Sequence, residues 1–492
     1  MSLPKRPQIR RPEKDRFGEV FTPPALINAM LDKLPPEVWT DPAKKWLDPA
    51  AGFGNFFTEV YPRLMKSLED VISNPSERRR HILTQMLYMV EYNPESCARI
   101  RENPMFFEND DKGIRVGVNL ICGSFLDPEI GTTAFDPRDG PVHFDIIVGN
   151  PPFNADQTHE GKKGGGANLW PRFVDKSLRS DLLKPDGLLL FVHPALWRKP
   201  PSPQAPTQFE LMTHENHMLY LEIHSKLEGL AVFGARTRYD FYVIQKRKPI
   251  PGVSTTFILT QGGQAYAAFD LSRWHFLPNH SYDVIGPLLR SPDDTTKPNV
   301  IFSRSKYGTD SPWVHEVQRT PEDIPLIHST PKGGPRILWS DPVECEGLEN
   351  LKQDCVPMVG VPKVIFGESG INKVIIDLEG RYGLTQGAIG LRIPGVNPDE
   401  QKAEAEQMAA ALESDIFNDI LNAMSFSNFR IDWRIFLYLQ PDFYKHPMFS
   451  NVKPHISPPK KSKHDAISRA GKKRYYSSKC KTRRRKNIRN KK

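Results

Sequence analysis

With 492 residues, of which 38% are hydrophobic and 10% aromatic, the chain can bury two or three cores, which excludes a wholly disordered protein. Five scattered cysteines without a C-x-x-C pair disfavour a zinc site or a disulfide framework and suit a reducing compartment, and no apolar stretch could span a bilayer. The net charge of +9 is concentrated in residues 472–492, which hold 12 Lys and Arg and no acid, so the rest of the chain is close to neutral.

The first half of the chain alternates short apolar runs with helical patterns. After a flexible arm over residues 1–16, Thr22 is expected to cap a helix, with Pro23 at its first position. Helices are expected over 25–34, 56–72, 94–102 and 169–183, and strands over 45–48, 86–91, 118–122, 144–148, 187–193, 220–223 and 241–244. This alternation predicts an α/β fold, a doubly wound Rossmann-like sheet over residues 17–250.

The second half of the chain has a looser pattern. Prolines and polar residues interrupt short β-rich pieces from residue 251 to about residue 400, and an amphipathic helix is expected over 401–424. We therefore expect a second, mixed α+β domain over 251–450. Residues 451–492 are expected to form a disordered basic tail that attracts polyanions, although a solubilising tail or a nuclear address would have the same composition.

Asn150-Pro151-Pro152-Phe153 follows the apolar run 144–149 and should lie at the carboxyl end of a strand, where open α/β sheets place their chemistry. The prolines fix the backbone and remove competing N–H groups, so the Asn150 side-chain oxygen and the Pro151 carbonyl form two neighbouring acceptors. With Phe153 beside them, they suit the exocyclic amino group of a flat base. An ordinary loop turn is the alternative interpretation, because Asn-Pro often opens turns.

A glycine turn follows the first strand, in the segment 47–56. Gly52 and Gly54 allow a sharp turn and the close approach of a ligand. Phe57 stands where a dinucleotide fingerprint has a third glycine or alanine, so a nucleoside without phosphates fits better than a pyrophosphate. Glu91 ends the next strand and could accept the ribose hydroxyl protons, unless it is only a surface charge. Ser124 and Phe125, after the third strand, could receive an adenine ring.

These motifs resemble the S-adenosylmethionine-dependent amino-methyltransferases that modify adenine in DNA, in the γ order, in which the cofactor motif precedes the catalytic motif. The resemblance covers roughly residues 17–248. It implies that the catalytic motif is Asn150, Pro151, Pro152 and Phe153, and that the cofactor is held by Phe21, Thr22, Pro23, Asp48, Ala50, Gly52, Gly54, Asn55, Phe56, Glu91, Ser124 and Phe125. The late motifs Phe233-Gly234 and 239–244 are similar to those that line the target-base pocket.

The resemblance implies S-adenosylmethionine as cofactor, no metal, double-stranded DNA as partner, and residues 251–450 as a target-recognition domain. Thr385-Gln386-Gly387 is similar to a stretch often found there, and eight basic residues are candidates for DNA contacts: Arg304, Lys306, Arg319, Lys363, Lys373, Arg381, Arg430 and Arg434. Many relatives have Asp where this chain has Ser124, so Asp127 is a candidate substitute. The chain shows no nuclease motif, and a separate restriction endonuclease acting on the same site is a candidate partner.

Other amino-methyltransferases with the same tetrapeptide act on RNA adenine or on protein glutamine, and a catalytically silent nucleic-acid-binding protein could keep the fold. The large second domain favours a nucleic acid whose sequence is read, hence DNA. The expected location is cytoplasmic or DNA-associated, without a membrane, or nuclear if the basic tail acts as an address.

Overall fold

The computed structural model of the protein describes residues 21–452 apart from 110–112, 114, 131–140, 154–167, 202–206, 251–254, 260–262, 292–293, 295, 297, 303–307, 342–358 and 427–429. The expected arm and nearly all of the expected basic tail lie outside these residues. Among the described helices, none is long and apolar enough to cross a bilayer.

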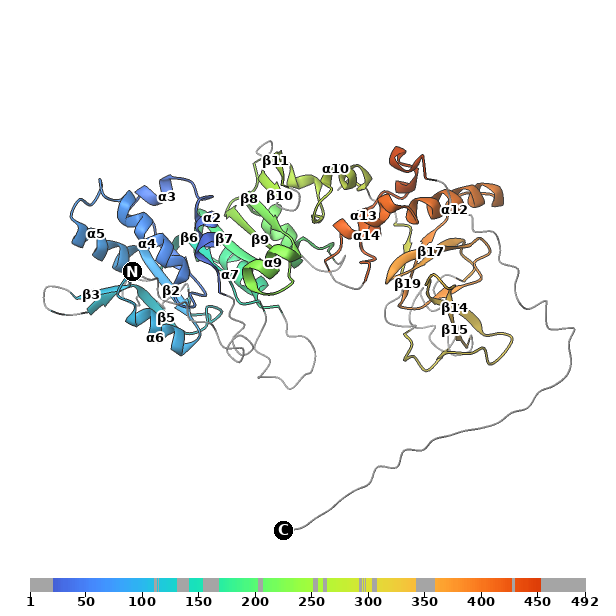
Figure 1. Cartoon of the computed structure of the whole chain (residues 1–492), viewed down its shortest axis with the longest axis horizontal. Helices are drawn as coiled ribbons and strands as arrows, with labels where there is room; N and C mark the ends of the chain where they lie inside the picture. Colours follow the sequence, from blue (N-terminus) through green and yellow to red (C-terminus); the bar gives the residue numbers. More distant parts are fainter. Residues whose placement is uncertain are drawn as a thin grey trace, which may run out of the picture.

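Nine described strands form one sheet in the order β11-β10-β8-β9-β7-β6-β1-β2-β5 (Figure 1). Their bounds are β1 Trp46–Asp48, β2 Leu87–Glu91, β5 Asn119–Cys122, β6 Phe144–Gly149, β7 Leu183–Pro194, β8 His217–His224, β9 Tyr239–Gln245, β10 Thr255–Leu259 and β11 Gln264–Phe269. The strands β5, β2, β1, β6 and β7 run parallel, and β9 is antiparallel to both β7 and β8. The sheet continues beyond residue 250, so the expected domain boundary at that position falls inside the sheet.

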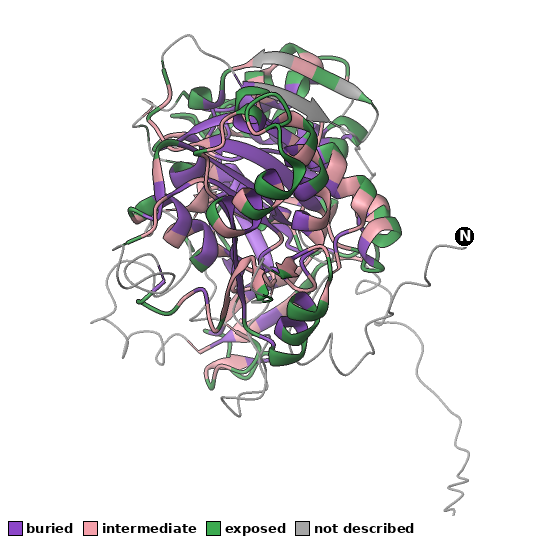
Figure 2. Ribbon diagram, turned by 90° about the vertical axis from the view of Figure 1, so that its left-hand side faces the viewer, coloured by how far each residue is buried: buried purple, intermediate pink, exposed green. Residues whose placement is uncertain are grey.

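Alternate residues of the central strands face opposite layers, as a doubly wound sheet requires. Trp46, Ile146 and Leu190 belong to the core layer under α2 and α4, whereas Leu47 and Ile147 belong to the core layer under α7 and α8. Figure 2 shows these buried strands inside the molecule with more exposed helices around them. The predicted α/β class is therefore confirmed.

Three of the described helices of this part begin with a side-chain cap predicted by local sequence signals. Asn93 caps α6 with Pro94 in its first turn, and Ser225 and Thr207 each close a capping box on α9 and α8. The bounds are α2 Pro24–Leu31, α3 Glu37–Thr40, α4 Asn55–Ser67, α5 Pro75–His81, the π-helix η1 Ile82–Met86, α6 Pro94–Glu102, α7 Trp170–Arg179, the 3-10 helix η2 Ala195–Arg198, α8 Gln208–Thr213, α9 Lys226–Phe233 and α10 Tyr282–Ile285. A small hairpin, β3 Phe107–Asn109 and β4 Arg115–Gly117, was not predicted.

Several helix predictions are wrong in detail. The helices expected over 56–72 and 169–183 end earlier, at Ser67 and Arg179. The N-cap of α2 is Pro23 and not Thr22. No side-chain hydrogen bond caps this helix. The helix expected over 401–424 is two helices, α12 Pro398–Leu412 and α13 Asp415–Ala423. The Ser414 side chain accepts a hydrogen bond from the Phe417 backbone N–H at 3.1 Å and so starts a new helix inside the continuous apolar pattern.

The C-terminal part mixes two four-stranded sheets with short helices, in agreement with the predicted α+β class. One sheet has the order β12-β19-β16-β17 and the other β13-β15-β14-β18. The bounds are β12 Val300–Ile301, β13 Val314–His315, β14 Ile324–Ser329, β15 Arg336–Ser340, β16 Lys363–Gly367, β17 Gly370–Asp377, β18 Gly383–Leu384, β19 Ala388–Arg392 and α14 Ile435–Tyr438. The Thr385–Gly387 stretch forms the turn between β18 and β19, where Thr385 contacts His328.

The nine-stranded sheet and the C-terminal part are joined by buried contacts along 277–290. The Asn279 backbone N–H donates to Ala423 at the end of α13, and the Arg290 backbone N–H donates to Tyr438 of α14. Figure 1 shows these elements between the sheet and the C-terminal strands. Buried residues on both sides of this junction belong to one continuous apolar cluster.

Candidate active site

Asn150–Phe153 follows β6 directly and lies at the carboxyl edge of the parallel strands. In chain order β6 is the fourth strand of the large sheet, as predicted. The chain reaches β5 at one side of β1 and then crosses to β6 on the other side, so the strand order reverses between β1 and β6. Open α/β sheets bind ligands at such a reversal, outside the carboxyl ends of the strands.

Gly149 brings this segment against the end of β1. A Cβ atom at Gly149 would lie 3.0 Å from Asp48 Oδ1 and 3.4 Å from the Pro49 ring, tighter than side chains usually pack. A larger residue would therefore push the two strand ends apart. The predicted catalytic motif and the predicted cofactor motif, about 100 residues apart in sequence, meet at this contact.

Thr22 holds the Asn150 side chain. The Asn150 Nδ2 donates a hydrogen bond to Thr22 Oγ1 at 3.0 Å, and Thr22 is buried. Because the amide is planar, a nitrogen directed at Thr22 places the Asn150 oxygen on the opposite side of the group. Thr22, expected to cap a helix and to hold the cofactor, thus directly contacts the asparagine of the predicted catalytic motif.

A chain of aromatic contacts leads away from Phe153. The Phe153 ring meets Phe233 of α9 edge to face at 6.3 Å, and Phe233 meets Tyr239 of β9 at 4.9 Å in the same manner. Tyr239 stacks on His224 at 4.2 Å. The late motifs singled out in the sequence therefore lie next to the tetrapeptide.

The glycine turn between β1 and α4 uses the conformational freedom of its glycines. Gly52 and Gly54 have φ angles of +56° and +79°, which side-chain-bearing residues rarely adopt. Gly54 precedes α4, and a Cβ there would come within 2.6 Å of the Phe106 ring. The turn therefore requires glycine at both positions, and at Gly54 for packing as well.

Glu91 ends β2 and ties this turn to the neighbouring strand. Its Oε2 accepts the Gly52 backbone N–H at 2.6 Å, and its Oε1 accepts the Asn93 backbone N–H at 2.7 Å. The side chain is only 6% exposed, so the interpretation of Glu91 as a loose surface charge is wrong. Glu91 thus holds the glycine turn against the loop before α6, and its role toward a ribose stays a prediction.

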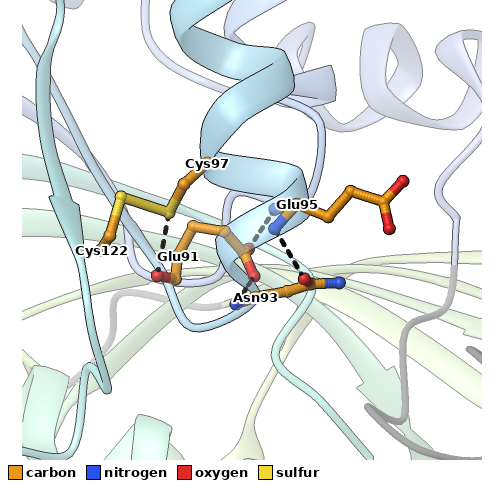
Figure 3. Close-up of a disulfide and its surroundings, with 6 residues drawn as sticks. Glu91, Asn93, Glu95, Cys97 and Cys122 are labelled. Carbon is orange, nitrogen blue, oxygen red and sulfur yellow. Dashed lines mark hydrogen bonds between the residues drawn. A yellow bond between two sulfur atoms is a disulfide. The ribbon is translucent and has the colours of Figure 1, made fainter.

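The structure corrects the expectation about cysteines next to Glu91. Cys97 of α6 and Cys122 at the end of β5 form a disulfide, with their Cα atoms 6.1 Å apart (Figure 3). This spacing is within the usual range for disulfides. The positions of the cysteines in the sequence did not indicate this pairing. The two cysteines are 25 residues apart and come together only because α6 packs next to β5 in the folded protein. The bond connects α6, the helix that follows Glu91, to β5, the strand that pairs with β2.

Asp48 is a buried carboxyl at the centre of the site. Its Oδ1 accepts the Ala50 backbone N–H at 3.1 Å, while Oδ2 has no hydrogen-bond partner among the described residues. Burial raises the pKa of Asp48 to about 8, against the lowering effect of the Ala50 N–H, and the charge of Glu91 raises it further. An unsatisfied buried carboxyl would be stabilised by a cation, so this position fits a positively charged ligand group.

Other predicted cofactor residues make structural contacts within the protein. The Phe125 ring is buried and stacks on Phe173 at 5.0 Å, and Phe56 is a buried residue of the first turn of α4. Ser124 Oγ accepts the Leu126 backbone N–H at 3.1 Å. The remaining predicted residues of the segment, Ala50 and Asn55, lie in the glycine turn and at the start of α4, and Phe21 and Pro23 flank Thr22.

Several basic residues proposed as DNA contacts are paired within the protein. Lys363 is buried and forms a 2.8 Å ion pair with Asp377, so its expected role at the DNA surface is wrong. The others that pair with acids are Arg381 with Glu379, Arg430 with Glu368, and Arg434 with Asp432. Arg319 and Lys373 are exposed, whereas Arg304 and Lys306 lie outside the described residues.

Sequence reasoning missed two features of the site. The contact between Thr22 and Asn150 spans 128 positions, and no spacing rule indicates it. Tyr92 follows Glu91 and is 62% exposed, an unusual state for a large ring at a strand end near a binding site. An aromatic residue directly after a strand-terminal acid is the sequence signal that indicates such a position.

Part of the chain matches a described protein family. Residues 85–227 match the Eco57I restriction-modification methylase family, and they include both Glu91 and Asn150–Phe153. An uncharacterized adenine-specific methylase of Mycoplasma pneumoniae is 26% identical over 237 residues, a match that covers 36% of this chain and 55% of the relative. The chain thus spans about half the length of that curated relative.

Solved structures give weaker similarities over longer stretches. The Type IIL restriction-modification enzyme MmeI in complex with DNA is 11% identical with a TM-score of 0.46, covering 88% of this chain and 68% of that chain. The ATP-dependent Type ISP enzyme LlaBIII bound to DNA is 11% identical with a TM-score of 0.49, covering 85% and 38%. The family match and the Mycoplasma relative, rather than these structures, confirm the resemblance of the segment holding Glu91 and Asn150–Phe153 to restriction-modification methylases of the adenine class.

Proposed function

We propose that this chain is a site-specific DNA methyltransferase that transfers a methyl group from S-adenosylmethionine to the N6 amino group of an adenine turned out of a duplex. The observation that carries the proposal is the contact of Gly149 with Asp48, because it unites the tetrapeptide and the glycine turn at the strand-order reversal. The family match over residues 85–227 supports the same reaction class.

The residues around the glycine turn fit S-adenosylmethionine. Glu91 would hold the ribose hydroxyls, and the exposed Tyr92 ring would lie against the adenine. Asp48 Oδ2, buried and without a partner among the described residues, suits the positive charge of the ligand. Bound there, S-adenosylmethionine supplies a methyl group already activated by its sulfonium, so no covalent enzyme intermediate is needed.

The target base would be held by the tetrapeptide. An adenine amino group cannot be reached inside a duplex, so the base must leave the stack, which costs a few kcal/mol. Phe153 would stack on the extruded ring while Phe233 contacts its edge, since the two rings already meet at 6.3 Å. The described C-terminal part would read the flanking sequence.

Asn150 and Pro151 would prepare the nitrogen for attack. The Asn150 Oδ1 and the Pro151 carbonyl would accept hydrogen bonds from the two amino N–H groups, which would turn the lone pair away from the ring and toward the methyl carbon. The C–S bond breaks as the N–C bond forms, and the nitrogen then releases one proton. Orientation of this kind can be worth about 7–11 kcal/mol.

Replacement of Asn150 with Ala tests the proposal. We expect transfer of tritiated methyl groups to duplex DNA to fall by on the order of 10²–10³-fold, the usual effect of removing one oriented polar group from a reaction centre, while S-adenosylmethionine still binds. Asn418→Ala, at an exposed position of α13, is the matched control and should retain activity. Equal loss of cofactor binding and transfer in Asn150→Ala would show that Asn150 is only structural.

The same methyl-transfer assay distinguishes DNA from the alternative substrates, RNA and protein. Wild-type protein is offered duplex DNA, RNA and protein substrates in parallel, and methylation-sensitive sequencing of the DNA product identifies the modified site. Labelling of RNA or protein alone would replace DNA as the substrate, and no labelling with intact DNA binding would indicate a catalytically silent protein. Whether a separate endonuclease cuts the same site can be tested once that site is known.

A further inference from the structure

We infer that His224 is a positioning residue for the target base, because its ring fixes Tyr239 and, through Phe233, the aromatic wall beside Phe153. The inference rests on the proposed function and adds to it a residue that lies outside the motifs found in the sequence. His224 acts on the base through these rings and is not assigned a contact with the base itself.

Strand pairing brings His224 to the edge of the sheet that holds the tetrapeptide. β6 and β7 run parallel, so their carboxyl ends share one edge. β9 is antiparallel to both of its neighbours, and Tyr239 at its start pairs with Pro194 at the end of β7 and with His224 at the end of β8. The end of β8 therefore lies at the same edge as Asn150–Phe153.

The His224 ring begins a continuous series of ring contacts. It lies face to face with the Tyr239 ring, with centroids 4.2 Å apart and planes only 5° apart. Tyr239 meets Phe233 edge to face at 4.9 Å, and Phe233 meets Phe153 in the same manner at 6.3 Å. Stacked and edge-to-face pairs have defined relative orientations. A change in the plane of the Tyr239 ring would therefore displace Phe233.

Two carboxylates hold the His224 ring in its plane. The Nε2 atom lies 3.2 Å from Glu222 Oε1, and the Nδ1 atom lies 3.3 Å from Glu228 Oε1. A rotated ring would lose at least one of these contacts. Glu222 is itself fixed, because its Oε2 accepts a hydrogen bond from the Tyr220 hydroxyl at 2.6 Å. His224 is only 7% exposed, so little water competes for these contacts.

The second carboxylate connects His224 to the helix that carries Phe233. Glu228 lies in the first turn of α9, where its Oε2 accepts the Ser225 backbone N–H at 2.7 Å in the capping box. Phe233 is the last residue of the same helix. Figure 1 shows α9 beside β8 and β9. His224 thus contacts the start of α9 through Glu228 and its end through Tyr239, and so fixes the helix relative to the sheet.

This arrangement should affect the reaction step more than cofactor binding. β9, β7 and β6 lie between β8 and β1 in the sheet, so His224 is remote from the glycine turn that follows β1. Methyl transfer requires the amino nitrogen to lie in line with the methyl carbon, and a small displacement of the reacting group lowers the rate strongly. A looser aromatic wall would hold the extruded base less precisely.

The test compares His224→Ala, His224→Phe and His224→Gln at saturating S-adenosylmethionine and duplex DNA, below the melting temperature of every variant. In His224→Ala, kcat should fall roughly 3- to 10-fold, the effect of losing one aromatic pair, while S-adenosylmethionine affinity stays at the wild-type value. His224→Phe keeps a ring on Tyr239 and should recover most of the rate. His224→Gln keeps polar contacts with the two acids but has no ring, and it should stay slow.

His217→Ala is the matched control for a loss of stability. His217 is a buried histidine at the other end of β8, 2% exposed. Its replacement should lower the melting temperature as His224→Ala does, but kcat should remain at the wild-type value. A difference in kcat between the two alanine variants then reports on the base and not on folding.

Three results would overturn the inference: a wild-type kcat in His224→Ala, recovery of the rate by glutamine but not by phenylalanine, or the same loss of kcat in His217→Ala. If wild-type protein methylated DNA while one of these results held, only the role of His224 would be disproved. A wild-type protein that methylated none of the offered substrates would overturn both the proposed function and this role.

Discussion

Asp48 shows how a single buried side chain can make the stability of this protein depend on pH. Its carboxyl is 1% exposed, and burial raises its pKa from 3.8 to about 8. Between about pH 4 and pH 8 the folded protein therefore holds a proton that the unfolded chain has released. The free energy of unfolding should fall as the pH rises through this window, because the folded state binds more protons.

We predict that Asp48→Asn removes this pH dependence. The amide keeps the size and one oxygen of the carboxyl but cannot ionise. Urea titrations of the ligand-free protein at pH 5 and pH 8 should show a smaller loss of stability in the variant, which should be more stable than wild type at pH 8. Identical pH profiles for the two proteins would contradict the raised pKa of Asp48.

Thr22 is predicted to act on the reaction through Asn150. Thr22→Val keeps the shape but removes the hydroxyl that accepts the Asn150 N–H at 3.0 Å. A neutral hydrogen bond is worth about 0.5–1.5 kcal/mol, so kcat should fall roughly 3- to 10-fold, with little change in S-adenosylmethionine affinity. Thr22→Ser, which keeps the hydroxyl, is the control and should restore kcat. If Thr22→Val lowered only the affinity for S-adenosylmethionine and not kcat, Thr22 would instead help to hold the cofactor, as its motif first indicated.

Single residues differed in how far their roles could be predicted. The glycines and the diproline corner were recognised because their chemistry is local: glycine is required where φ is positive, and proline fixes its own backbone. The position of Glu91 at the end of a strand was predicted and is confirmed, whereas its role toward a ribose stays a prediction. The Thr22–Asn150 contact and the burial of Phe125 could not be predicted, because each depends on a residue far away in the chain.

Among the secondary-structure elements, α9 is the one that depends most directly on a close backbone approach. We predict that Gly229→Ala destabilises the protein by about 1–3 kcal/mol, the usual cost of overpacking, because its Cβ would collide with the Thr237 carbonyl. Thermal unfolding measures the effect, and methyl transfer should fall as α9 and Phe233 shift.

Gly333→Ala is the matched control for this change. Gly333 has no neighbour within 4 Å of a built Cβ and no positive φ, so alanine there should be neutral or stabilise by about 0.4–1 kcal/mol. If both variants unfolded at the same temperature as wild type, the close packing of α9 would be refuted.

Elements of the large sheet were predicted better than those of the C-terminal part. Short apolar runs bounded by turn residues marked β1, β2, β6 and β9 within a few residues, because a strand buried on both faces needs such a run. The break between α12 and α13 was missed, since the apolar stripe continues across Ser414 and only its capping bond separates the helices.

At the scale of the whole molecule, a buried ion pair of the sheet part lies at its junction with the C-terminal part. Arg198 and Asp240 are both fully buried and lie 2.7 Å apart. Arg198 also donates to the Leu277 and Pro278 carbonyls, and Asn279 carries the contact on to α13. The pair therefore lies where the two parts of the described chain meet.

We predict that Asp240→Ala destabilises the protein by about 3–5 kcal/mol, because it leaves the Arg198 charge buried without its partner. Chemical denaturation should show a lower midpoint. The exposed pair of Arg273 and Asp270 offers a comparison, since Arg273→Ala there should cost less than about 1 kcal/mol. Equal effects at the two positions would mean that the buried pair does not hold the junction.

The sequence by itself determined the α/β class, the order of the strands along the chain, and the two motifs at strand ends, because these follow from local backbone chemistry and from apolar periodicity. Tertiary structure alone decided which distant groups meet: Gly149 against Asp48, Thr22 on Asn150, Cys97 with Cys122, and α9 against Thr237. The physical reason is that such contacts depend on how strands are ordered and helices packed in three dimensions, and spacing along the chain carries little information about either.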